Sequence, residues 1–165
     1  MTLVIGTLIL TLLVIIQSSI VSRLGLAFGS PDILMLVLIA LGMQPETKRT
    51  VLWFGIGGLL MSIVSAIPLM YPLIPYLIIG TSIIYIRKRI WKIPLMMMLV
   101  LSFVGAVISG VIAYLTILLT RVNMPIWQSF YSVILPSSTL NIVFGIPIYL
   151  IVKDWSKWLN PRDDE

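Results

Sequence analysis

The chain has 165 residues, of which 59% are hydrophobic and 10% charged, against about 45–50% and 25% in soluble domains. It contains neither cysteine nor histidine, which excludes disulfides, thiolate nucleophiles, imidazole bases and zinc sites built from those ligands. The net charge of +5 does not indicate nucleic-acid binding, because the basic residues lie beside apolar stretches, as in membrane proteins.

Six apolar segments follow one another in a single domain. They cover Leu3–Val21, Asp32–Met43, Val51–Ile67, Tyr71–Ile86, Pro94–Leu119 and Ser138–Val152. A membrane-crossing helix needs about 20 residues, so the second segment is short and the fifth is long enough to tilt. The first has neither a basic leader nor a small-residue cleavage site, and we expect it to be retained as a helix. We predict an all-α integral membrane protein, with a compact bundle of six transmembrane helices over residues 1–153 and a short cytoplasmic tail over 154–165.

A polar interruption separates the first two segments. Its polar residues include Gln17, Ser18, Ser19 and Arg23, and it ends in Ser30-Pro31-Asp32. This ending is a helix-start signal: serine caps free N–H groups, proline suits the first helical position, and an acid suits the positive end of the helix dipole. Asp32 is the only acid in the first 45 residues. We predict that the stretch from Gln17 to Asp32 is structurally or functionally central.

The basic residues alternate between the joints that connect the segments. Nine belong to the second and fourth joints and the tail: Lys48, Arg49, Arg87, Lys88, Arg89, Lys92, Lys153, Lys157 and Arg162. Arg23 and Arg121 are the two in the other joints. The positive-inside rule therefore predicts that both termini are cytoplasmic.

The joints on the opposite side are apolar and aromatic. The third, around Pro68, Pro72 and Pro75, should close a tight antiparallel hairpin, and it fits a partner site or a rigid hairpin dipped into lipid. In the fifth, apolar residues recur at helical spacing between Pro125 and Pro136: Ile126, Trp127, Phe130, Val133 and Ile134. We predict a short amphipathic helix on the outer leaflet, the alternative being an apolar loop anchored in lipid. Together with Tyr131, and with Trp91, Trp155 and Trp158 on the basic side, these aromatic residues are typical of interface anchors.

The residue types for catalysis are sparse. No lysine, arginine, aspartate or glutamate falls in the middle of a predicted span, where proton-coupled transporters place them. Paired carboxylates occur only in the tail, and no histidine is present to activate a serine. We predict that the chain is not an enzyme and uses no cofactor or metal.

Small residues recur at helical spacing in two segments. The third has Gly55, Gly58, Ser62 and Ser65, and the fifth has Ser102, Gly105 or Ala106, Ser109 or Gly110, and Ala113. Such stripes let helices approach closely in lipid. They fit internal packing, which we favour, or a face that docks a partner.

The sixth segment contains an amide side chain, Asn141, within its apolar sequence, followed by Pro147 and Tyr149. An amide in hydrocarbon needs a partner, so we expect a hydrogen bond to another helix, with ligand binding as the alternative. Pro147 can kink the helix and free a carbonyl.

These residues resemble the rod shape-determining protein MreD family. The likeness rests on Gln17-Ser18-Ser19, then Leu24, Gly29 and Pro31-Asp32, then Phe54-Gly55-Ile56-Gly57-Gly58-Leu59-Leu60, and on Asn141, Pro147 and Tyr149. Overall size and charge alternation agree. The sequence departs from the family pattern at Met61-Ser62, where many relatives have an acid, and at the proline-rich turn around Tyr71.

The resemblance implies a non-enzymatic inner-membrane scaffold of the bacterial cell-elongation (Rod) complex. Its expected direct partner is MreC, with MreB, RodA and its partner transpeptidase in the same assembly. Membrane lipid surrounds such a protein, and neither nucleic acid nor a small-molecule substrate is expected. The six-helix plan also resembles the S-components of vitamin transporters, and the alternative function is a substrate-binding subunit of that type, with a pocket using Asn141, Gln17 and outer-loop aromatic residues. The alanine-x-x-x-alanine motif that S-components typically carry in the first span is replaced here by Gly6, Thr7 and Thr11.

Overall fold

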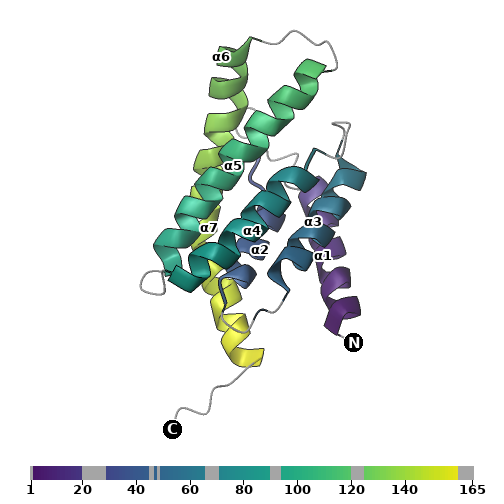
Figure 1. Ribbon diagram of the computed structural model, residues 1–165, viewed down its shortest axis with the longest axis vertical. Coiled ribbons are helices and arrows are strands. Elements are labelled where there is room, and N and C mark those ends of the chain that lie inside the picture. Colours follow the sequence, from purple (N-terminus) through teal and green to yellow (C-terminus); the bar gives the residue numbers. More distant parts are fainter. Residues whose placement is uncertain are drawn as a thin grey trace.

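The computed structural model consists of helices packed side by side, with no strand in the parts of the chain that it describes (Figure 1). Those parts are residues 2–19, 29–44, 47, 49–65, 71–89, 94–119 and 125–159. The elements in chain order are α1 (Thr2–Ser19), α2 (Ile33–Gly42), α3 (Thr50–Val64), α4 (Leu73–Arg89), α5 (Pro94–Leu119), α6 (Ile126–Ser129), the π-helix η2 (Phe130–Ile134) and α7 (Leu135–Leu159). The predicted all-α class is confirmed, and a helix occupies each of the six apolar segments.

Two of these helices are long and apolar enough to cross a membrane. They are Pro94–Leu119 and the continuous helix Phe130–Trp155, each of 26 residues. Such a helix is about 39 Å long, which exceeds the roughly 30 Å of a hydrocarbon core. The other apolar helices are shorter: Val4–Ser19, Ile33–Gly42, Thr50–Val64 and Leu73–Arg87.

The outward faces of the helices are apolar. Side chains such as Val4, Leu8, Ile63 and Leu119 are 64% to 80% exposed. Large contiguous apolar surface is rare on soluble monomers, so lipid is the solvent that suits these faces. The fold therefore supports a membrane protein, in agreement with the composition.

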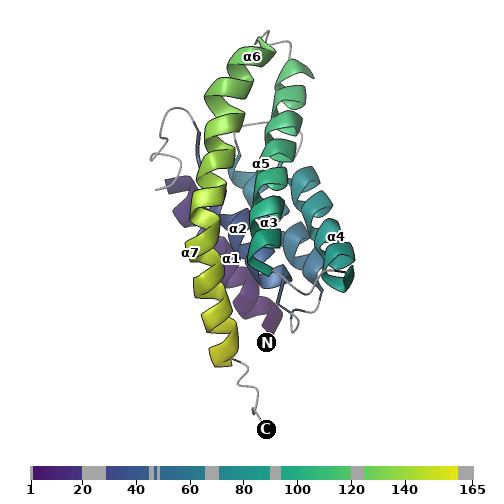
Figure 2. The same ribbon diagram turned by 90° about the vertical axis from the view of Figure 1, so that its left-hand side faces the viewer.

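The short helix α2 lies at the centre of the bundle. It contacts α1, α3, α4, α5 and α7, and Figures 1 and 2 show it enclosed by the longer helices. Seven of its ten residues are buried: Leu34, Met35, Leu36, Leu38, Ile39, Ala40 and Gly42. A helix that is hydrophobic on all sides is buried on all sides, and α2 fits that rule. The rest of the core comes from its neighbours, with Phe54, Tyr76, Ile79, Ile83 and Met98 less than 2% exposed.

The small residues of α3 and α5 face inward. A Cβ atom on Gly58 would lie 3.0 Å from the Leu73 backbone of α4, and one on Gly55 would lie 3.7 Å from Leu77. On α5, a Cβ on Gly105 would meet Met35 and one on Gly110 would meet Ile134. These glycines serve internal packing, the reading that the sequence favoured.

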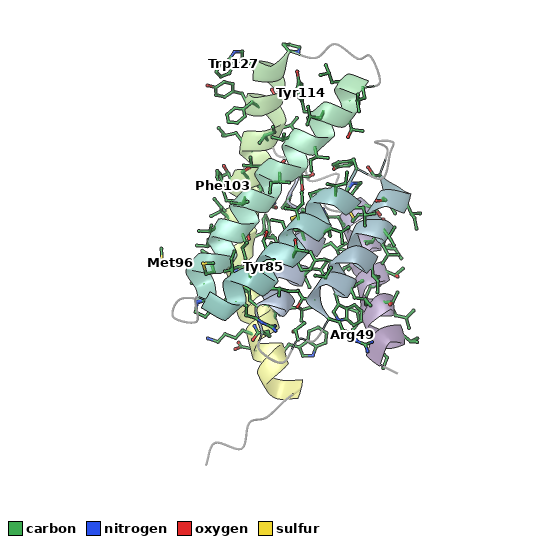
Figure 3. The ribbon with its side chains drawn as sticks, in the orientation of Figure 1. Arg49, Tyr85, Met96, Phe103, Tyr114 and Trp127 are labelled. Carbon is green, nitrogen blue, oxygen red and sulfur yellow. The ribbon has the colours of Figure 1, made fainter. Side chains whose placement is uncertain are left out.

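The first and last helices begin and end at the same end of the molecule. Figures 1 and 2 place the start of α1 and the end of α7 at the lower end, while α5 and α6 reach the upper end. Arg49 lies near the lower end and Trp127 at the upper end (Figure 3). Arg49, from the basic second joint, and Trp127, from the aromatic fifth joint, therefore lie at opposite ends of the molecule.

The predicted surface helix between Pro125 and Pro136 is not a separate element. Residues 126–134 are helical, but they continue through η2 directly into α7 (Figure 2). The Leu135 N–H donates to the carbonyl of Phe130, five residues earlier. This wider turn precedes Pro136, which lacks an N–H and would otherwise clash with the preceding turn. The helix thus passes a proline that the sequence suggested would interrupt it, and α7 also continues beyond the predicted end at Val152 to Leu159.

Some predicted positions lie outside the described residues. They are Val21, Arg23, Leu24, Lys48, Ile67, Pro68, Trp91, Lys92, Arg121, Arg162 and the acids at 163–165.

Candidate functional site

The N-terminus of α2 is held by hydrogen bonds from three other helices. We call Gln17, Asp32, Tyr76 and Asn141 the α2 clasp. Asp32 is the N-cap of α2, and its Oδ1 accepts from the Met35 N–H at 3.0 Å. The helix therefore begins two residues later than the Ser30-Pro31-Asp32 signal predicted. The cap is Asp32 and not Ser30, and the first helical residue is Ile33 and not Pro31, because aspartate caps a helix as well as serine does.

Gln17 connects the last turn of α1 to this helix end. Its Nε2 donates to the Pro31 carbonyl at 2.7 Å, and its Oε1 accepts from the Ile33 N–H at 3.0 Å. The side chain is 7% exposed. One amide thus satisfies a backbone acceptor and a backbone donor on either side of the N-cap, where helices leave N–H groups without internal partners.

Asn141 connects α7 to the same position. Its Oδ1 accepts from the Asp32 N–H at 2.7 Å, and the residue is 2% exposed. One turn earlier, Ser137 Oγ accepts from the Ser30 N–H at 3.3 Å. Gly29 lies against this turn, where a Cβ would come within 2.6 Å of Pro136 and 2.7 Å of the Ser137 backbone. The chain entering α2 is therefore fixed along α7 over four residues.

Tyr76 completes the clasp from α4. Its hydroxyl donates to Asp32 Oδ1 at 2.7 Å, and its ring packs edge-on against Phe54 of α3 with centroids 6.3 Å apart. Tyr71, in the turn before α4, lies within electrostatic range of the same carboxylate. Buried tyrosines usually find a partner for the hydroxyl, and here the partner is the capping acid.

The C-terminus of α2 is held in a complementary way. Arg87, near the end of α4, donates through Nη1 to the carbonyls of Gly42, Gln44 and Thr47 at 3.0–3.3 Å. Thr47 Oγ1 also donates to the Leu41 carbonyl at 2.6 Å. With an acid at its N-terminus and a cation at its C-terminus, α2 has both dipole ends compensated.

Of the remaining predicted site residues, all within the described parts of the chain, one contributes a backbone carbonyl to the α2 clasp, and the others make no hydrogen bond to it. Pro31 is buried and contributes its carbonyl to Gln17. Ser18 donates to the Ile15 carbonyl at 3.1 Å, and Ser19 is exposed at the end of α1. Tyr149 is buried in the core, 6% exposed. Pro147 lies within α7 on an exposed position, and the helix continues through it.

Two residues that bond the ends of α2, Tyr76 and Arg87, were not predicted from the sequence as part of this site. Tyr76 belongs to a predicted apolar segment, and a tyrosine hydroxyl in such a segment indicates a need for a polar partner. Arg87 was read only as a topology signal. An arginine at the end of one helix also suits the free carbonyls at the end of another helix.

Several hydroxyls on the helices bond their own backbone, whereas the buried Ser109 Oγ of α5 has no hydrogen-bond partner among the described residues. Ser102, Thr116 and Ser138 each donate to the carbonyl four residues earlier, at 2.6–2.8 Å. The polar side chains of the clasp likewise bond the backbone or one another. What this arrangement does is to fix helix positions: it anchors α1, α4 and α7 to one end of a buried helix.

Comparisons with protein-family models, with curated proteins and with solved structures find no match for this chain. The resemblance to the MreD family therefore stays a prediction from the sequence.

Proposed function

We propose that this chain is a non-enzymatic inner-membrane scaffold of the bacterial cell-elongation (Rod) complex, similar to MreD proteins. In this proposal the six helices α1 to α5 and α7 form one multi-pass bundle with both termini in the cytoplasm. The bundle binds MreC directly and joins MreB, RodA and its partner transpeptidase in supporting peptidoglycan synthesis and cell shape.

One observation carries this proposal: the polar side chains singled out by the sequence are used to build a rigid bundle. Gln17, Asp32 and Asn141 bond the α2 end, and Tyr76 bonds Asp32. The outer faces of the same helices are left apolar. A rigid interior with apolar flanks suits a protein that works by packing against other transmembrane helices.

The charge distribution supports the proposed orientation. Arg49, Arg87 and Lys153 belong to the end that carries both termini, and the Trp127–Tyr131 stack, with ring centroids 5.7 Å apart, belongs to the other. Basic residues favour the cytoplasmic side, and aromatic residues favour the headgroup level. The two ends of the molecule thus have the chemistry of an inner and an outer membrane surface.

In this orientation the α2 clasp lies well inside the hydrocarbon. Asn141 and Lys153 are 12 residues apart on α7, which corresponds to about 18 Å of helix rise. In this orientation Asp32 would lie near the middle of a core roughly 30 Å thick. The sequence put this acid at the end of a segment, so the expectation that no ionisable side chain lies deep in a span would not hold for Asp32. A polar group at this depth is costly without partners, which is why Asp32 is bonded from α2 and α4.

Co-purification tests the proposal. The tagged chain, extracted from membranes in a mild detergent, should retain MreC through size-exclusion chromatography, and it should carry no tightly bound vitamin. Recovery of the chain free of MreC, with a vitamin and a transporter ATPase module bound instead, would establish the S-component alternative. That alternative needs Gln17 and Asn141 in a pocket, whereas here both polar atoms of Gln17 and the Asn141 carbonyl bond backbone groups.

A further inference from the structure

The first turn of α3 has backbone N–H groups that find no acceptor among the described residues. α3 begins at Thr50, and the preceding N-cap residue, Arg49, makes no side-chain capping bond. The Arg49 carbonyl accepts from the N–H groups of Leu52 and Trp53 at 3.0 and 3.2 Å. The N–H groups of Thr50 and Val51 have no acceptor among the described residues, and they point out of the helix end.

The Thr50 side chain is a second, independent feature at this helix end. It is only 4% exposed, and its methyl packs so closely on α2 that a Cβ on Gly42 would lie 2.9 Å from it. Its hydroxyl has no hydrogen-bond partner in the described parts of the chain. The buried hydroxyls of Ser102, Thr116 and Ser138 differ, since each donates to a carbonyl four residues earlier in its own helix.

The position of Thr50 explains why its hydroxyl has no acceptor within its own helix. It is the first residue of α3, so no helical carbonyl precedes it by four residues. The Cα–Cβ bond of a helical residue tilts toward the helix N-terminus, so this side chain leans toward the same end as the free N–H groups. The Thr50 side chain and two backbone donors are therefore found at the same end of α3.

The charge at this place calls for an anion. Arg49 is exposed and is the N-cap residue of α3, next to the positive end of the helix dipole, where a cation is unfavourable by itself. An anion between the guanidinium and the helix end would be attracted by both. Helix N-termini bind phosphate groups in this way, and phosphate oxygens also accept from arginine and from hydroxyls.

We propose that Arg49, the Thr50 hydroxyl and the N–H groups of Thr50 and Val51 bind the phosphate of an anionic phospholipid headgroup. The inference rests on the proposed orientation, in which α3 begins at the cytoplasmic surface, where anionic lipids lie next to basic residues. Arg49 lies at that end of the molecule in Figure 3. The site would tie the loop between α2 and α3 to the inner leaflet.

Lipid titration of the purified full-length chain tests this site. Phosphatidylglycerol, phosphatidylcholine and inorganic phosphate are each titrated in neutral detergent, and bound molecules are counted by native mass spectrometry. Phosphatidylglycerol should bind the wild-type chain more tightly than the other two. Arg49→Gly should weaken that binding about fivefold, the effect of one basic residue at a membrane surface, and Thr50→Val should weaken it while preserving the methyl contact with Gly42.

The variants are chosen so that folding can be separated from binding. Arg49 has φ of 61°, a conformation that glycine adopts more readily than arginine, so Arg49→Gly should unfold at the same or a higher temperature. Lys153→Gln removes an equal charge from α7 at the same end and is the matched control. It should reduce phosphatidylglycerol binding less than Arg49→Gly does.

Two results would overturn the assignment. If Lys153→Gln weakens binding as much as Arg49→Gly, the attraction is general surface charge and no site exists at α3. If inorganic phosphate binds as tightly as phosphatidylglycerol, the ligand is free phosphate and the lipid assignment is wrong. The assay contains no MreC, so either result leaves the scaffold proposal to its own co-purification test.

Discussion

Asp32 links three helices through one backbone group and one carboxylate oxygen. Its N–H donates to Asn141 of α7, and its Oδ1 accepts from Met35 of α2 and from Tyr76 of α4. Loss of a shared acceptor strands more than one buried donor, which costs more than a single hydrogen bond contributes. The residue is therefore more than a helix cap.

Asp32→Ala should lower the free energy of unfolding by about 1–3 kcal/mol, because the Met35 N–H and the Tyr76 hydroxyl both lose their acceptor. Asp32→Asn keeps an oxygen at the N-cap and should cost less than about 1 kcal/mol. Thermal unfolding in detergent, followed by circular dichroism, measures both. Equal losses for the two variants would show that the charge, and not the hydrogen bonds, is what the site needs.

Tyr76→Phe isolates the bond that joins α4 to the clasp. It removes only the hydroxyl and should destabilise the protein by about 1–3 kcal/mol, because a buried carboxylate oxygen loses a donor. Tyr85→Phe is the control on the same helix, since Tyr85 is 77% exposed, and its midpoint should not change. A Tyr76→Phe protein with the wild-type midpoint would mean that the 2.7 Å contact contributes nothing to the fold.

At the scale of elements, apolar runs bounded by charges and prolines predicted where the helices lie. The predicted bounds of α5 coincide with the observed ones, because Pro94 suits a first helical position and the apolar run ends at Leu119. Asn141 was predicted to need a polar partner, but its partner is a backbone N–H more than 100 residues away in sequence. Hydrogen bonds between residues so far apart produce no local pattern in the sequence, so the sequence could not predict them. The same holds for the π-helical turn through which the helix continues past Pro136.

The close approach of α3 and α4 gives a paired test at one interface. A Cβ on Gly80 would lie 2.8 Å from Phe54, a fully buried ring, so Gly80→Ala should destabilise the protein by about 1–3 kcal/mol through overpacking. Gly55→Ala, on the facing helix, meets Leu77 at 3.7 Å and should be neutral or stabilising by up to about 1 kcal/mol, since alanine favours helix. Unfolding midpoints decide the comparison. A tolerated Gly80→Ala would mean that the two helices do not pack this closely.

At the scale of the whole molecule, the absence of cysteine from the sequence makes topology directly measurable. Single cysteines are introduced by Thr2→Cys, at the start of α1, and by Pro125→Cys, just before α6. In intact spheroplasts, an impermeant maleimide should label Pro125→Cys at once and Thr2→Cys only after permeabilisation. Labelling of both from outside would contradict a cytoplasmic N-terminus and with it the proposed arrangement of six spans.

In the proposed function, this bundle supports cell elongation by holding other membrane proteins together. Depletion of the chain from a rod-shaped bacterium that encodes it, with re-expression as the control, measures this most directly by cell shape. We predict that depleted cells widen and become round, and that re-expression restores rods. Depleted cells that stay rod-shaped, and grow normally unless a vitamin is withheld, would contradict it.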